Sequence, residues 1–193
     1  MSGRRRQGAS PGHRDDAVFK GRVVLITGGA RSGKSRHALA LAETARKRGF
    51  IATAAPTDDE MRLRIARHRA ERGERFDTVE ETMDLAGAVR SLGSDHNIIV
   101  VDCLTVWLGN LAHHRGTGDP FPEVAAFLDI LREPPCDLVI VTNEVGMGLV
   151  PGGELGRWFR DLAGQVNQAV AQIADRVILM VCGMPLAIKE EET

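Results

Sequence analysis

The stretch "RVVLITGGARSGKS" (residues 22–35) joins a short apolar run to a glycine-rich turn, and the helix-like segment "RHALALAETARKRG" (36–49) follows it. The apolar run is rich in β-branched residues and shows no polar alternation, which is typical of a parallel strand buried on both faces. A glycine-rich turn between such a strand and a helix usually holds phosphate groups. These residues therefore predict both an α/β fold and a nucleotide site.

The turn (28–35, hereafter the phosphate loop) satisfies the pattern G-x-x-x-x-G-K-[ST] without a mismatch, through Gly28, Gly33, Lys34 and Ser35. The glycines let the backbone curl so that successive N–H groups point at the β-phosphate, and the helix that begins there adds the positive end of its dipole. We expect Lys34 to reach the β- and γ-phosphate oxygens and Ser35 to ligate Mg²⁺. The loop identifies a nucleotide site, but it does not identify the second substrate.

Strand-like and helix-like segments alternate along the rest of the chain. We expect further strands over 50–54, 97–104, 137–144 and 176–183, with an edge strand over 185–189. We expect helices over about 33–47, 60–73, 78–92, 121–132 and 154–175. Gly49 is expected to end the first helix, and Asp58 or Asp59 to cap the second. Alternation at this spacing predicts a three-layer α/β domain with a mostly parallel sheet, of the RecA-like P-loop NTPase class.

Composition favours one globular domain. The chain has 193 residues, and its net charge of -1 gives no overall attraction to nucleic acid or membranes. Residues 1–20 are basic and carry little to bury, so we expect a disordered tail there and a single nucleotide-binding catalytic domain over 21–193. The tail lacks the apolar region of a secretion signal, and no apolar run approaches the ~18 residues of a membrane span.

The cysteines indicate the compartment. Cys103, Cys136 and Cys182 lie far apart, in or beside apolar runs and without CxxC spacing. This pattern argues against a zinc site and against a disulfide framework. We therefore expect reduced thiols in the core of a cytoplasmic protein.

Two carboxylates follow strand-like runs and are candidates to complete a metal site. Asp102 ends "NIIVVD" (97–102), where a Walker-B carboxylate belongs, on a strand that we expect to neighbour the first strand. Glu144 follows "VIVTN" (139–143) and is the second candidate. A helix cap or a salt bridge at a strand end is the competing interpretation for each.

The segment "DDEMRLRIARHRAERG" (58–73) places His68 among arginines. On a helix, Arg64 and Arg72 lie four residues before and after His68 and share its face. Their planar guanidinium groups suit phosphate oxygens, and a neutral imidazole can attack phosphorus. On this pattern alone, a solvent-facing histidine on a basic helix is the favoured interpretation.

The other histidines give weaker signals. We expect His37 to pack within the helix that follows the phosphate loop or to face solvent. His113 and His114 are expected in a glycine-rich loop, without a carboxylate at metal-ligand spacing. His96 carries no functional signal in the sequence.

Six segments together resemble the bifunctional adenosylcobinamide kinase/adenosylcobinamide-phosphate guanylyltransferase family of cobalamin biosynthesis. The resemblance runs in the same order from Val23 to Lys189. Two stretches within these segments, "TNEVGMGLVP" and "DLAGQVNQ", are far more specific than the phosphate loop. All six are "GGARSGKSRHA", "IATA", "DDEMRLRIARHR", "VVDCLTVWLGN", "VTNEVGMGLVP" and "FRDLAGQVNQ".

The resemblance implies two consecutive reactions. The enzyme first phosphorylates the hydroxyl of the aminopropanol arm of adenosylcobinamide, with GTP or ATP as donor. A histidine then takes GMP from GTP, releases pyrophosphate and passes the GMP to the new phosphate, which gives adenosylcobinamide-GDP. In this family the nucleophilic histidine lies on the helix with the pattern "RI-x-x-H" after "DDEM", which here gives His68. Some relatives have two adjacent histidines at that point, but the preceding residue here is Arg67, so His68 is the only candidate. Lys34 and His68 are therefore the expected catalytic residues, with Ser35 and Asp102 expected to hold Mg²⁺.

The resemblance also implies nucleotide contacts and an assembly. Glu80 and Asp102 either accept hydrogen bonds from a guanine edge or help to hold the metal. Family members assemble as trimers, so a homo-oligomer is expected. The implied nucleotide contacts are Gly28, Gly29, Ala30, Arg31, Ser32, Gly33, Lys34, Ser35, Ala52, Thr53, Ala54, Arg69, Ala70, Glu71, Arg72, Glu80 and Asp102.

Two other classes of function share the phosphate loop. A plain small-molecule P-loop kinase would use the loop and Asp102 but would need no histidine nucleophile. A nucleotide-dependent switch or assembly ATPase would turn over slowly and would act on a partner protein. Nucleic-acid binding rests only on Arg4–Arg6 and is not expected.

Overall fold

The computed structural model describes residues 21–56, 59–117 and 121–190, so the tail predicted for residues 1–20 lies outside the described part. A seven-stranded sheet with the order β3-β2-β4-β5-β1-β6-β7 forms the centre of the fold. Neighbouring strands run parallel except β7, which runs antiparallel to β6 and forms the predicted edge. The strands are β1 (Val23–Gly28), β2 (Arg48–Ala52), β3 (Asp77–Glu80), β4 (Ile98–Asp102), β5 (Asp137–Val141), β6 (Arg176–Val181) and β7 (Met184–Lys189).

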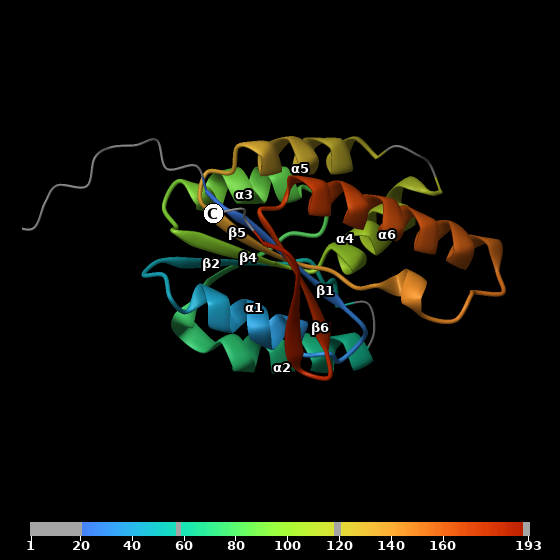
Figure 1. Ribbon diagram of the computed structural model, residues 1–193, viewed down its shortest axis with the longest axis horizontal. Coiled ribbons are helices and arrows are strands. Elements are labelled where there is room, and N and C mark those ends of the chain that lie inside the picture. Colours follow the sequence, from blue (N-terminus) through green and yellow to red (C-terminus); the bar gives the residue numbers. More distant parts are fainter. Residues whose placement is uncertain (1–20, 57–58, 118–120, 191–193) are drawn as a thin grey trace, which may run out of the picture.

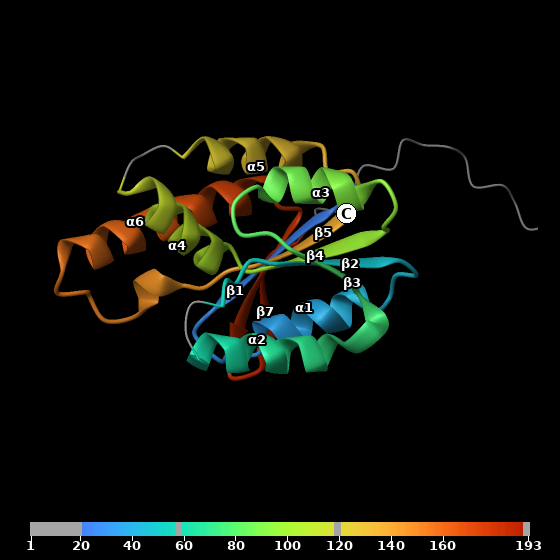
Figure 2. The same cartoon turned by 180° about the vertical axis from the view of Figure 1, so that it is seen from behind.

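Helices cover both faces of the sheet (Figures 1 and 2), which confirms the predicted three-layer α/β architecture. One face carries α1 (Lys34–Ala42) and α2 (Asp59–Arg72), and the other carries the remaining helices. Those are α3 (Leu85–Gly93), α4 (Leu104–Arg115), α5 (Pro122–Arg132) and α6 (Glu154–Ile173). Two short 3-10 helices, η1 (Gly73–Arg75) and η2 (Val145–Met147), follow α2 and β5. No helix among the described residues has both the length and the apolar character needed to cross a membrane.

Each face of the sheet has its own hydrophobic core. Under α3–α6 the core contains Trp107 and Phe127, whose ring centroids lie 5.4 Å apart, together with Leu138 and Val170. The core under α1 and α2 is smaller and includes Phe50 and Phe76, in an edge-to-face pair. Burial on both faces explains why the central strands read as continuous apolar runs in the sequence.

The first helix is shorter than predicted. α1 ends at Ala42 instead of Lys47, and Gly49 lies inside β2 instead of ending the helix. A Cβ on Gly49 would lie 3.1 Å from Cγ1 of Ile99, so glycine lets β2 pass close to its neighbour β4. The strand pairing of 48–52 therefore overrides the helix-like pattern of 43–47.

The segment 78–92, predicted as one helix, is a strand followed by a helix. Residues 77–80 form β3, because they pair in parallel with β2. The helix α3 begins only after Asp84, whose Oδ1 accepts a hydrogen bond from the backbone N of Gly87 at 2.9 Å. Glu81 Oε1 accepts from the backbone N atoms of Met83 and Asp84, and these bonds fix the turn between the two elements.

Helix α4 is not among the predicted helices: Leu104 is expected at the end of a strand, His113 and His114 are expected in a loop, and residues 105–112 carry no prediction. Its buried residues Leu104, Trp107, Leu108 and Leu111 follow the i, i+3, i+4, i+7 spacing of an amphipathic helix. His113 and His114 consequently lie in the last turn of a helix, where both are exposed, and not in a loop.

The long helix and the cysteines depart from prediction in part, and α6 ends at Ile173 instead of Asp175. α6 buries Leu162, Val166 and Val170 as expected, but Leu155 is 62% exposed. Cys103 and Cys136 are buried, and burial, together with the neighbouring Asp137 carboxylate, raises the pKa of the Cys136 thiol to about 12. Cys182, expected in the core, is exposed at the turn between β6 and β7.

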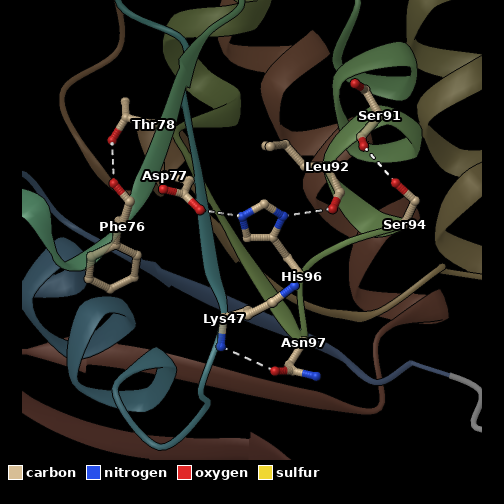
Figure 3. Close-up of polar contacts among 9 residues, drawn as sticks. All are labelled: Lys47, Phe76, Asp77, Thr78, Ser91, Leu92, Ser94, His96 and Asn97. Carbon is tan, nitrogen blue, oxygen red and sulfur yellow. Dashed lines mark hydrogen bonds and ion pairs between the residues drawn. The ribbon is translucent and has the colours of Figure 1, made fainter.

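His96 ties three elements together at the end of the sheet where β2, β3 and β4 begin (Figure 3). Its ring is 9% exposed, with Nδ1 2.8 Å from the carbonyl oxygen of Leu92 in α3 and Nε2 2.9 Å from Oδ2 of Asp77 in β3. The next residue, Asn97, accepts a hydrogen bond at Oδ1 from the backbone N of Lys47. The histidine without a functional signal is thus a structural residue.

We predict that His96→Ala lowers the free energy of unfolding by about 1–3 kcal/mol, because a nearly buried ring is lost together with its hydrogen bonds to Leu92 and Asp77. Urea denaturation measures the effect. The matched control His114→Ala, on the exposed side of α4, should change stability by less than about 0.5 kcal/mol. Equal effects of the two substitutions would contradict this role for His96.

Candidate active site

A cavity of about 1600 Å³ lies where β1, β4 and β5 end and α1 begins. The phosphate loop from Gly29 to Ser35, His68 of α2, Asp102 at the end of β4 and Glu144 after β5 all border it. Ligands of open α/β sheets bind at this carboxyl edge. The structure therefore brings the phosphate loop, the candidate nucleophile and both candidate carboxylates to one cavity.

The phosphate loop needs its glycines for two different reasons. Gly28 and Gly33 have φ angles of 144° and 97°, in a region that side chains strongly disfavour. A Cβ on Gly28 would also lie 2.5 Å from the carbonyl oxygen of Met180 in the neighbouring strand β6. The loop's conformation is thus set both by backbone freedom and by close packing against β6.

Lys34 is the buried cation of the loop. The residue is 7% exposed, and Nζ donates to the carbonyl oxygens of Gly28 at 3.0 Å and Gly29 at 2.6 Å. A third contact, to Oγ of Ser32, measures 3.5 Å. The ammonium group therefore sits within the curl of the loop, where phosphate oxygens of a nucleotide would meet it.

Asp102 borders the cavity, but the prediction that its strand neighbours the first strand is wrong. β5 lies between β1 and β4, and Asp102 pairs in register with Val141 of β5 and Ala52 of β2. Sequence alternation gives the number of strands but not their order, because a crossover can place a later strand between two earlier ones. The strand beside the phosphate-loop strand is instead the one that ends before Glu144.

Glu144 is fixed to the strand that carries the phosphate loop. Its backbone N donates to the carbonyl oxygen of Gly28 at 3.2 Å, and Oγ1 of Thr27 donates to its Oε1. Nδ2 of Asn167, from α6, reaches the same Oε1 at 3.4 Å. Thr142 in turn donates to Oδ1 of Asn167 at 2.7 Å. Because Thr27, Thr142 and Asn167 are all buried, this network holds the carboxylate in a defined position.

His68 is half-buried on α2 and borders two cavities. One is the large cavity, and the other is a cavity of about 50 Å³ between α2 and the sheet, which Ala52, Ala54 and Asp102 also line. Arg67 shares the wall of the large cavity with His68. The imidazole thus stands between the phosphate loop and the ends of β2 and β4.

Arg72, which the sequence predicts to share the face of His68, packs against the aromatic ring of Phe50. The Arg72 side chain is 4% exposed, and its guanidinium carbon lies 4.0 Å from the centre of the Phe50 ring, as a cation–π contact. Arg72 borders the small cavity with His68 but not the large one. The side chains of Arg64 and Glu71, and residue Asp58, lie outside the described part of the chain.

Several predicted nucleotide contacts do not border the large cavity. Thr53 is fully buried, and its Oγ1 exchanges hydrogen bonds with the backbone N and O of Cys103 at 2.8 and 2.9 Å, so it joins β2 to β4. Arg69 forms an ion pair with Glu80 on the exposed surface. The predicted contacts outside the large cavity are Gly28, Ala52, Thr53, Ala54, Arg69, Ala70, Arg72 and Glu80.

The structure adds residues that the sequence did not single out. Thr105 and Asn143 border the large cavity, and so do Cys182 and Gly183 of the β6–β7 turn. The backbone N of Gly183 donates to the carbonyl oxygen of Ser32 at 3.0 Å. Only the pairing of β6 with β1 brings this turn to the loop, and no local pattern in the sequence reveals that pairing.

The oxygen donors in the cavity suit a hard cation that is also bound by a nucleotide, rather than a metal ion held by protein ligands alone. Ser35 and Asp102 offer a hydroxyl and a carboxylate, which are ligands that Mg²⁺ accepts together with phosphate oxygens and water. Within residues 21–56, 59–117 and 121–190, no three His, Cys, Asp or Glu side chains cluster closely enough to hold a metal ion by themselves. The donor set therefore fits an ion that arrives with a nucleotide.

Solved structures share this fold at low sequence identity. The Pyrococcus horikoshii OT3 protein PH0250 aligns with a TM-score of 0.54 at 10% identity, over 91% of this chain and 90% of that one. A prototypical ATPase from the type III secretion system of pathogenic bacteria aligns with a TM-score of 0.52 at 11% identity. That alignment covers 82% of this chain and 50% of the ATPase chain. These likenesses concern the fold, and they support the predicted α/β P-loop class.

Sequence comparison is more specific. The chain is 45% identical over 168 residues to the bifunctional adenosylcobalamin biosynthesis protein CobP of Pseudomonas aeruginosa, an alignment that covers 86% of this chain and 97% of that protein. It is 39% identical over 181 residues to the corresponding protein CobU of Escherichia coli, covering 86% and 99% of the two chains. The family model described as cobinamide kinase/cobinamide phosphate guanyltransferase matches residues 24–188. The chain belongs to this cobinamide kinase/cobinamide phosphate guanyltransferase family.

Proposed function

We propose that this protein phosphorylates the aminopropanol hydroxyl of adenosylcobinamide with GTP or ATP and then transfers GMP from GTP to that phosphate, giving adenosylcobinamide-GDP. Family membership supports the two reactions. The observation that carries the proposal is the single cavity shared by the phosphate loop and His68. A kinase without the second reaction would have no use for a histidine on this wall.

In the first reaction the phosphate loop binds the donor nucleotide. The loop's N–H groups and the start of α1 neutralise the β-phosphate, and Lys34 compensates the charge that develops on the transferred γ-phosphoryl group. Ser35 and Asp102 would hold Mg²⁺, which would neutralise phosphate charge when bound with the nucleotide. Transfer to a hydroxyl then depends mainly on positioning and on charge neutralisation.

In the second reaction an imidazole nitrogen of His68 bonds to the α-phosphorus of GTP, and the bond to pyrophosphate breaks. An oxygen of adenosylcobinamide phosphate then bonds to the same phosphorus, and the N–P bond breaks. The intermediate divides one displacement between two anionic phosphates into two easier steps. The remaining implied contacts lie on α2 and at the ends of β2 and β3, where we place the nucleoside in this step: Ala52–Ala54, Arg69–Arg72 and Glu80.

We also propose the homotrimer that the family resemblance implies. Every residue of the edge strand β7 is exposed, including Met184, Leu186 and Ile188, and Val181 of β6 is exposed beside them. Such a continuous apolar edge favours burial against another copy of the chain. The cytoplasmic location inferred from the cysteines stays a prediction.

We predict that Lys34→Ala abolishes phosphorylation of adenosylcobinamide. Loss of one preorganised positive donor should cost about 3 kcal/mol of transition-state stabilisation, or at least about 100-fold in rate. Transfer of γ-labelled phosphate from GTP measures the effect. Near-normal turnover would show that the phosphoryl group is transferred elsewhere.

Asp102→Asn should raise the Mg²⁺ concentration needed for half-maximal activity, because a neutral amide is a weaker ligand for a hard cation than a carboxylate. The kinase rate is measured over a range of Mg²⁺ concentrations at saturating nucleotide. The exposed residue Asp129, in α5 on the far face of the sheet, provides the control Asp129→Asn. An unchanged Mg²⁺ dependence of Asp102→Asn would exclude Asp102 as a ligand.

His68→Ala should separate the two reactions. The variant should still phosphorylate adenosylcobinamide, since that step does not use the imidazole, but it should neither take up label from α-labelled GTP nor release pyrophosphate. In the wild type the labelled adduct should be acid-labile and base-stable, as an N–P bond is. His114→Ala serves as the matched control. Retention of α-label by His68→Ala would assign the nucleophile to another residue.

A further inference from the structure

We propose that Glu144 is the general base of the phosphorylation step, an inference that rests on the proposed function. In that step the hydroxyl oxygen of the acceptor bonds to the γ-phosphorus, and the bond from that phosphorus to the oxygen bridging the β-phosphate breaks. The nucleoside diphosphate leaves with that oxygen. The hydroxyl proton passes to the carboxylate of Glu144 and from there to solvent.

The position of Glu144 carries the proposal. It borders the same cavity as the phosphate loop and follows β5, the strand that pairs with β1 on the side of Asp102. Its backbone N bonds to the carbonyl oxygen of Gly28, the first residue of the loop. The backbone of Glu144 is therefore fixed directly to the start of the phosphate loop, whereas Asp102 lies one strand further away.

The hydrogen bonds of Glu144 leave one oxygen for a substrate. Thr27 and Asn167 both donate to Oε1, and no donor among the described residues contacts Oε2. One oxygen thus orients the carboxylate while the other can accept a proton from a group in the cavity. Thr27 and Asn167 are positioning residues in this scheme.

A carboxylate in this place has a defined task. Phosphoryl transfer to an alcohol needs a group that orients the hydroxyl and accepts its proton, whereas attack by His68 on GTP involves no hydroxyl proton. The proposal therefore assigns Glu144 to the first reaction and excludes it from the second. That division can be measured, because the two half-reactions use differently labelled GTP.

The test compares Glu144→Gln with wild type and with Glu133→Gln, an exposed residue before β5 at the opposite end of the sheet. Glutamine keeps an oxygen that Thr27 and Asn167 can bond, so the fold is retained, and thermal unfolding checks this. We expect kcat for γ-phosphate transfer to adenosylcobinamide to fall at least about 100-fold. Uptake of α-label and its transfer to pre-formed adenosylcobinamide phosphate should stay within about twofold of wild type.

Other outcomes overturn the proposal. Unchanged phosphorylation would show that Glu144 is not the base, and equal losses in both half-reactions would make it a general structural residue. A raised Mg²⁺ requirement in Glu144→Gln would make it a metal ligand. If the wild type transfers no γ-phosphate to adenosylcobinamide, the proposed function fails as well, so the two failures are distinguishable.

The positioning role of Thr27 has its own readout. Thr27→Val removes the donor to Oε1 at nearly constant volume and should lower kcat for phosphorylation while leaving the KM for GTP unchanged. Thr27→Ser restores the hydroxyl and should restore kcat. A rise in KM without a fall in kcat, or no rescue by serine, would contradict the role assigned to this hydrogen bond.

Discussion

The parallel pairing of β1 with β5 on one side and β6 on the other determines where the rest of the site can lie. It fixes the end of β1, where Gly28 pairs with Met180 and Ile26 pairs with Val141. From Val141 the register continues through Asp102 and Ala52 to Glu80. The register of the parallel strand pairs therefore aligns the carboxyl ends of the strands along the cavity. The polar side chains come into reach of one another because the buried strands β1, β2, β4 and β5 end at the same edge of the sheet, and not because they attract each other.

The helix that carries His68 is less buried than the strands that carry the phosphate loop and Glu144. α2 is strongly polar, and on its inner side Met61, Ile65 and His68 are only half-buried, while Arg72 is buried against Phe50. The phosphate loop and Glu144, in contrast, are fixed by buried strands and a buried hydrogen-bond network. The two proposed reactions thus share one cavity, but the proposed nucleophile lies on a less buried element than the phosphate loop does.

Local patterns predicted much of this fold, and pairing between distant segments decided the rest. The phosphate loop, the three layers, α5, α6 and the edge strand follow from motif, alternation and amphipathic spacing. The segment 78–92 was misassigned because its first residues become a strand only through β2, and the strand order could not be read from local sequence at all. The missing prediction of α4 has a different cause, because its amphipathic spacing is visible in the sequence. The buried residues that show this spacing are Leu104, Trp107, Leu108 and Leu111. The network around Glu144 joins residues up to 117 positions apart, which no local pattern reveals.

The distribution of the thiols has a practical consequence. All three cysteines are among the described residues, and two of them, Cys103 and Cys136, are buried. The third, Cys182, is exposed on the wall of the cavity, in the turn whose Gly183 bonds to Ser32 of the phosphate loop. A maleimide fluorophore would therefore attach at one defined point of the unmodified chain. Its emission would report nucleotide arrival at the loop in real time, without any engineered cysteine.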